Sequence, residues 1–83
     1  MTRIELVEQL NAMTMVEEVD TYLMDKGNFI VVTTTRKMKR KEFDALEMVL
    51  NHFGAEEIVP QRFEFLEYRI TLDGVEHIIE LYA

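Results

Sequence analysis

Apolar positions at the start of the chain recur with the spacing of a helix. Thr2 followed by Glu5 fits a capping box, in which each side chain accepts a hydrogen bond from the other residue's backbone N–H. An apolar stripe then runs from Ile4 to Leu10 at helical spacing. The pattern predicts a first short helix over about residues 3 to 12.

A second capping-box pattern predicts a second helix. Thr14 is followed by Glu17, and apolar residues recur at helical spacing from Val16 to Leu23. We therefore expect two short N-terminal helices, the second over about residues 15 to 25. A single kinked helix is the alternative, because residues 11 to 14 contain no Gly or Pro that would force a break.

The middle of the chain predicts a strand followed by a longer helix. Lys26 and Gly27 fit the end of the preceding helix. Residues 29 to 35 are almost all β-branched or aromatic, and their continuous apolar start is typical of a strand that is buried on both faces. The most regular helical pattern follows over about residues 39 to 53 and ends at Gly54. Its apolar residues are Phe43, Leu46, Val49, Leu50 and Phe53.

The last part of the chain predicts a β-hairpin with a defined register. Asp73-Gly74 is a dipeptide that two-residue type I′ turns favour. The pairs on the apolar face are Leu72 with Val75, Ile70 with His77, Tyr68 with Ile79 and Leu66 with Leu81. The other face carries Thr71, Arg69 and Glu67 opposite Glu76, Ile78 and Glu80. We expect this second face to be exposed to solvent, because the first face is almost wholly apolar and the second is mostly polar.

These elements predict an α+β fold in a single domain, residues 1–83. A right-handed crossover through the long helix would make the first two strands parallel, and the last strand would pair antiparallel with both. We therefore expect two short N-terminal helices, then β-α-β-β with a three-stranded antiparallel sheet in the order 2-3-1, packed on the long helix. A short extra strand from Glu57 to Val59, before Pro60, is an alternative that the sequence allows.

Charge is distributed very unevenly along the chain. Five of the nine basic residues lie in one six-residue stretch, although the formal net charge is −7. This basic cluster consists of Arg36, Lys37, Lys39, Arg40 and Lys41. Without it, four basic residues remain against sixteen acidic ones. Such opposed charges are typical of proteins that orient their partners by electrostatic steering.

The basic cluster is either a binding site or a solvated loop. It bridges the end of the central strand and the first turn of the long helix, where positive side chains oppose the helix dipole and favour an anionic ligand. That ligand would be an acidic protein surface or the phosphates of a nucleic acid. No aromatic residue for base stacking is interleaved with the cluster. If the cluster is a solvated loop instead, Glu42 or Asp44 neutralises its charge.

Aromatic residues continue the hairpin onto the face that should be exposed. Phe65 should lie opposite Tyr82, with Phe63 close by and Ile78 on the same face. A β-bulge near Phe65, cover by the N-terminal helices, or a contact with a subunit or partner would each account for this. The third explanation makes Phe63, Phe65, Ile78 and Tyr82 candidates for an apolar interface, and it leaves a homodimer open.

The two predicted N-terminal helices carry acidic residues outside their apolar stripes. These are Glu5, Glu8, Glu17, Glu18, Asp20 and Asp25. A solvated surface is the simplest interpretation. The sharper one is an acidic interface that mimics phosphates and occupies a nucleic-acid-binding site on another protein, as small acidic inhibitors encoded by mobile elements do.

Side chains for catalysis or metal binding are few. Cysteine and serine are absent, which removes disulfides, thiolate zinc sites and two classes of nucleophile. His52 should lie in the last helical turn and His77 on the apolar hairpin face with one hydrogen-bond partner. Glu67 and Glu80 should face each other and repel, with Arg69 as a mediator. We therefore expect no catalytic residue, no metal and no cofactor.

Together these patterns favour an interaction protein. The first ten residues lack the basic and apolar regions of a signal peptide, and no apolar run could span a membrane, so we expect a cytoplasmic protein. The function we predict is non-enzymatic binding of another protein through charge complementarity and an apolar patch, as a regulator or inhibitor. The alternative is a nucleic-acid-associated protein that contacts phosphates through residues 36 to 41.

Overall fold

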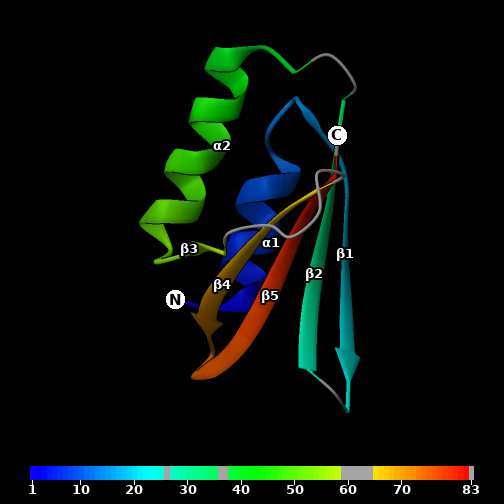
Figure 1. The fold of residues 1–83 in the computed structure, drawn as a ribbon, viewed down its shortest axis with the longest axis vertical. Coiled ribbons are helices and arrows are strands. Elements are labelled where there is room, and N and C mark those ends of the chain that lie inside the picture. The colour runs from blue at the N-terminus through cyan, green and yellow to red at the C-terminus, as the bar shows by residue number, and fades with distance from the viewer. Residues whose placement is uncertain (26, 36–37, 59–64, 83) are drawn as a thin grey trace.

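Two helices and five strands make up the described part of the chain (Figure 1). The computed structural model of the protein describes residues 1–25, 27–35, 38–58 and 65–82. In chain order the elements are α1 (Arg3–Asn11), β1 (Val16–Met24), β2 (Gly27–Thr34), α2 (Arg40–His52), β3 (Glu56–Ile58), β4 (Phe65–Leu72) and β5 (Val75–Tyr82).

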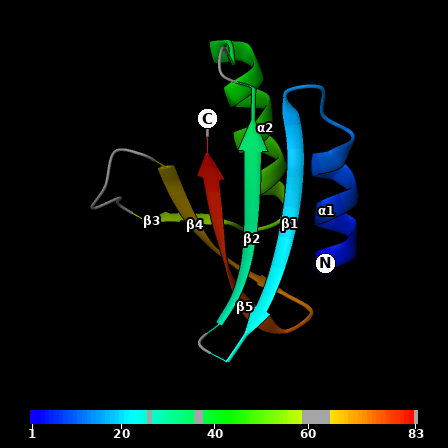
Figure 2. The same cartoon turned by 90° about the vertical axis from the view of Figure 1, so that its right-hand side faces the viewer.

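The five strands form one mixed sheet in the order β1-β2-β5-β4-β3. Neighbouring strands are antiparallel except for β2 and β5, which run parallel at the centre of the sheet. Both helices lie on the same side of the sheet, which we call the covered face (Figures 1 and 2). The opposite side is the open face, and neither of the two described helices covers it.

The hydrophobic core lies between the helices and the covered face. α1 contributes Leu6 and Leu10, and α2 contributes Leu46 and Leu50, all four of them at most 1% exposed. The sheet contributes Ile30, Val32, Tyr68, Ile70, Leu72, Ile79 and Leu81. These are alternate residues of their strands, because successive side chains of a strand point to opposite faces. Each fully buried aliphatic side chain contributes roughly 1.5–3 kcal/mol, so most of the stability resides on the covered face.

The first predicted helix is confirmed as α1. The Thr2 Oγ1 atom accepts the Glu5 N–H at 3.1 Å, and Glu5 Oε1 accepts the Thr2 N–H at 3.0 Å, which completes the capping box. The buried stripe is narrower than the sequence predicts, because Leu6 and Leu10 face the core whereas Ile4 is 65% exposed.

The predicted second helix over residues 15 to 25 is wrong, and so is the kinked-helix alternative, because β1 occupies this part of the chain. β1 pairs antiparallel with β2, beginning with Val16 opposite Thr34. A register shift leaves Glu17 as an extra residue, and this bulge allows both Val16 and Val19 to face the core. Their spacing of three residues therefore mimics a helical stripe although the backbone is extended.

The predicted three-stranded antiparallel sheet is also wrong. β5 lies between β2 and β4, but it runs parallel to β2. The cause is β3, the short strand that the sequence allows only as an alternative. Since β3 is antiparallel to β4, it is parallel to β2, and the crossover through α2 ends at β3. One additional strand therefore reverses the direction of the hairpin that follows it.

The β4–β5 hairpin has the predicted register along its whole length. The pairs run from Leu72 with Val75 to Phe65 with Tyr82. Asp73 and Gly74 have φ angles of 54° and 74°, and a type I′ turn requires positive φ at both of its central residues. The turn also contacts the start of α1, because Asp73 Oδ2 accepts the Arg3 N–H at 3.1 Å. A negative charge at this end of a helix is favourable.

α2 begins and ends one residue inside its predicted range. Leu46 and Phe53 are buried against the sheet, and the chain leaves the helix through Gly54, whose φ is 85°. At the other end, Glu42 Oε1 accepts the Lys39 N–H at 2.9 Å. Glu42 therefore caps the helix through the backbone of Lys39, and this contact does not involve a basic side chain of residues 39–41.

Candidate functional site

The open face consists of the residues that alternate with the core along each strand. On β2, Ile30 and Val32 are buried on the covered face, so Phe29 and Val31 point to the open face. The strand registers align such residues in rows that cross several strands. One row is Tyr22, Phe29, Ile78 and Arg69, which we call the aromatic row. The next is Asp20, Val31, Glu80 and Glu67, which we call the acidic row.

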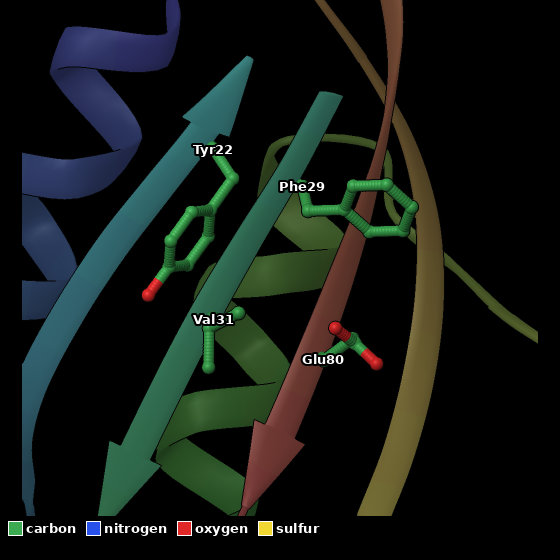
Figure 3. A pocket seen from close by; sticks show the side chains of 4 residues that line it. All are labelled: Tyr22, Phe29, Val31 and Glu80. Carbon is green, nitrogen blue, oxygen red and sulfur yellow. The ribbon is translucent and has the colours of Figure 1, made fainter. Parts of the chain in front are cut away.

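The aromatic row is apolar over three neighbouring strands. Tyr22 is 49% exposed, and both Phe29 and Ile78 are partly exposed. Tyr22, Phe29, Val31 and Glu80 line a shallow depression of about 270 Å³. Figure 3 shows these four side chains on the near side of the sheet, with α2 behind it. This apolar surface is therefore separate from the core.

The acidic row places like charges next to each other. Glu80 and Glu67 are direct partners in the antiparallel β4–β5 pair, and like charges in this position destabilise a sheet. Arg69 does not mediate between them, because its Nε lies 3.6 Å from Glu76 Oε1 instead. Among the described residues, no cation forms an ion pair with Asp20, Glu67 or Glu80. The row is thus suited to a cation from another molecule.

Two of the predicted apolar interface residues, Ile78 and Tyr82, lie on the open face, on either side of Glu80 along β5. Ile78 and Tyr82 are partly buried there, Phe65 pairs with Tyr82 across the strands, and Phe63 lies outside the described residues. The Tyr82 hydroxyl donates to Glu80 Oε2 at 3.4 Å. The bulge explanation fails because the β4–β5 register has no shift at Phe65. Cover by the N-terminal helices fails because α1 lies on the covered face and the predicted second helix is the strand β1.

The basic cluster is only partly within the described residues. Residues 39–41 are exposed at the start of α2, whereas Arg36 and Lys37 lie outside the described part of the chain. Arg40 Nε lies 3.3 Å from Asp44 Oδ1, but the Arg40 side chain is 89% exposed, and such surface pairs contribute little. Of the three described cations, Arg40 is therefore paired with a carboxylate of the protein itself.

The acidic candidates do not form a single surface. Glu5 and Glu8 lie on α1, Glu17, Glu18 and Asp20 on β1, and Asp25 follows β1. Because this segment is a strand, Glu18 and Asp20 pair with Thr33 and Val31 on the open face. The proposed surface of two acidic helices is therefore corrected to one pair of carboxylates beside the aromatic row.

Among the described residues, Thr34, Tyr68 and His77 bury polar groups on the covered face, and the Thr34 hydroxyl donates to the Tyr82 carbonyl at 3.1 Å. Burial, together with the carboxylates of Glu47 and Glu57, raises the pKa of Tyr68 from 10.0 to about 12. His77 is 2% exposed, and its Nδ1 donates to the Val75 carbonyl at 2.9 Å, which agrees with the single partner expected from the sequence. Within the described residues, no group of three or more His, Asp and Glu side chains could hold a metal ion.

All four residues of the depression are missing from the sequence-based candidates, and Glu80 was expected only to face and repel Glu67. Tyr22 falls in the wrongly predicted helix, and Phe29 and Val31 fall in a strand that was expected to be buried on both faces. The sequence nevertheless contains one pattern that indicates a strand at Tyr22. Glu18, Asp20 and Tyr22 recur at every second position, which is the period of a strand and places all three on one face.

Comparisons with known proteins give no match, because no family model fits the sequence and no curated protein or solved structure is significantly similar. Neither α1 nor α2 has the length and apolar character of a membrane-spanning helix, and this holds for the described residues.

Proposed function

We propose that the protein is a non-enzymatic binding protein that docks its open face onto a positively charged surface of another protein. The observation that carries this proposal is the aromatic row lying directly beside the acidic row on an uncovered sheet face. An apolar centre with a charged rim is the usual composition of a protein interface. The aromatic side chains would supply affinity, and the carboxylates would supply orientation and a fast association rate.

The charge of the open face indicates the kind of partner. If two copies met through their open faces, Glu67 and Glu80 of one copy would approach carboxylates of the other, which is repulsive. The phosphates of a nucleic acid would be repelled from this face in the same way. A basic protein surface complements it. Binding without turnover would regulate or inhibit the partner by occupying its surface.

Capture from a lysate of the source cells tests the proposal with three immobilised proteins. These are the wild type, Glu80→Lys on the open face and Glu8→Lys on the exposed surface of α1. Both variants replace one carboxylate by an ammonium group. We expect a basic protein to be retained by the wild type and by Glu8→Lys, and to be reduced about tenfold or more with Glu80→Lys.

Salt provides the second readout of the same experiment. The captured protein should elute as the ionic strength rises above about 0.15 M, because exposed charges are then screened beyond about 8 Å. Equal capture by all three proteins would contradict a role for the open face, whatever protein is captured.

The nucleic-acid alternative rests on the basic cluster of residues 36 to 41, of which residues 39–41 are described and lie exposed at the start of α2. Fluorescence anisotropy with labelled oligonucleotides at about 50 mM salt tests it, since phosphate contacts are strongest at low salt. We expect no binding. The alternative would be favoured if the wild type bound the oligonucleotide, a charge-reversed variant of residues 39–41 lost this binding, and Glu80→Lys kept it.

A further inference from the structure

The depression on the open face combines aromatic surface with negative charge. Val31 lies between the ring of Tyr22 and the carboxylate of Glu80, and the ring of Phe29 lies above Glu80 in the view of Figure 3. Asp20 is the β1 partner of Val31, so a second carboxylate lies in the same row. The ligand that fits must therefore be cationic and must also present apolar surface to the rings.

We propose that this depression binds an arginine side chain of the partner, an inference that rests on the proposed function. A guanidinium group is planar, and its faces stack on aromatic rings through cation–π and dispersion interactions. Its edge carries N–H donors that form paired hydrogen bonds with a carboxylate. Tyr22 and Phe29 supply the rings, and Glu80 supplies the carboxylate.

The width of the site favours arginine over lysine. The strands that carry Asp20 and Glu80 are separated by two interstrand spacings, ~10 Å, with Val31 between them. A guanidinium over Val31 can donate from opposite edges towards both carboxylates, whereas an ammonium group is a compact point charge. The ammonium group is also more strongly hydrated, and it would lose more solvation against the apolar side chains.

Glu67 adds a reason for a cation to bind here. It faces Glu80 directly across the β4–β5 pair, and Arg69, two residues along β4, contacts Glu76 instead. A bound guanidinium would offset the repulsion between Glu67 and Glu80 in addition to forming its own contacts. A neutral isostere of arginine would not offset the repulsion between Glu67 and Glu80, so it should bind more weakly.

Titration of the ¹⁵N-labelled full chain with the peptide acetyl-Gly-Arg-Gly-amide tests the site. We expect saturable amide shifts centred on Tyr22, Phe29, Val31 and Glu80. The matched peptide with citrulline, which keeps the shape and removes the charge, should bind about fivefold or more weakly. The lysine peptide should bind about threefold or more weakly.

Variants separate the aromatic and acidic contributions. Glu80→Gln removes the charge with little change of shape, and Phe29→Leu removes the ring, so each should weaken binding of the arginine peptide about threefold or more. Tyr22→Leu provides a second test of ring stacking at a position that is 49% exposed, where substitution should change stability little. Glu8→Gln on α1 removes the same charge elsewhere and should leave binding unchanged.

The outcomes distinguish this inference from the proposed function. Non-saturable shifts, or equal shifts with the arginine and citrulline peptides, would overturn the arginine site even if partner capture still depended on Glu80. Binding of the arginine peptide that Glu80→Gln and Phe29→Leu both weaken would support the site, and it would do so even if no partner were captured and the proposed function failed.

Discussion

The two faces of this sheet differ although the same strands build both. Ile79 and Ile78 are neighbours on β5, yet Ile79 is fully buried under the helices and Ile78 lies partly exposed in the aromatic row. The covered face joins apolar residues to one another, whereas the open face sets apolar residues beside carboxylates. The comparison shows that the two-residue period of a strand separates stability from recognition without any additional element.

The largest expected effect comes from truncating the two isoleucines separately. Ile79→Ala should lower the free energy of unfolding by about 2–5 kcal/mol, because it leaves a cavity in the core. Ile78→Ala should lower it by less than about 1 kcal/mol, because solvent already reaches the side chain. Urea denaturation followed by circular dichroism measures both changes. Similar losses for the two variants would show that the open face is packed like the core.

The second effect appears in alkali and concerns Tyr68 on the covered face. Its pKa is about 12 in the folded protein and near 10 when unfolded, so folding favours the neutral hydroxyl. The resulting stabilisation is fully present below pH 10, and it is lost as the pH rises from about 10 to about 12, by up to roughly 2–3 kcal/mol.

Tyr68→Phe should therefore gain stability relative to the wild type across this pH range, by up to the same amount. The free energies of unfolding of both proteins at about pH 8 and about pH 11.5 give the difference, and deprotonation of other groups then affects both equally. Tyr22→Phe on the open face is the control and should show no such gain. A constant difference between Tyr68→Phe and the wild type would contradict the burial of this hydroxyl.

The smallest effect comes from the acidic row. Glu67→Lys places a cation opposite Glu80 and should stabilise the fold by about 0.2–1 kcal/mol at low salt. Thermal denaturation with Glu8→Lys as the control measures it. The same variant should weaken partner capture, because the new ammonium group takes the place of the partner's cation. If Glu67→Lys is more stable and still captures the partner as well as the wild type does, Glu67 takes no part in partner binding.

The sequence predicts the β4–β5 hairpin correctly because two independent patterns agree there. Asp73-Gly74 sets the turn, and strict alternation around it sets the faces, so Ile78 and Tyr82 can be placed on the open face without a structure. Local information suffices for this hairpin since each strand pairs with its neighbour in the chain. The same holds for α1 and α2, whose caps and apolar spacing are local.

β1 and β3 are not predictable in this way, for different reasons. In β1 the bulge at Glu17 breaks the alternation, and Thr14 followed by Glu17 imitates a capping box. β3 spans only Glu56–Ile58, which is too short to show any period. Its existence depends on pairing with β4, and the direction of β5 depends on β3. The two-residue period of Glu18, Asp20 and Tyr22 indicates their common face, but it does not predict the depression, because Tyr22 and Phe29 meet only once β1 pairs with β2.

The parallel pairing of β2 with β5 has a consequence for how the molecule assembles. Asn28 pairs with His77, so the central ladder joins segments that are far apart in the sequence, and such ladders form slowly. Without this ladder the sheet consists of two ribbons, β1–β2 and β5–β4–β3, with unpaired edges at β2 and β5. Both halves of the depression therefore come together only in this long-range step, when β5, which carries Glu80, pairs with β2, which carries Phe29 and Val31.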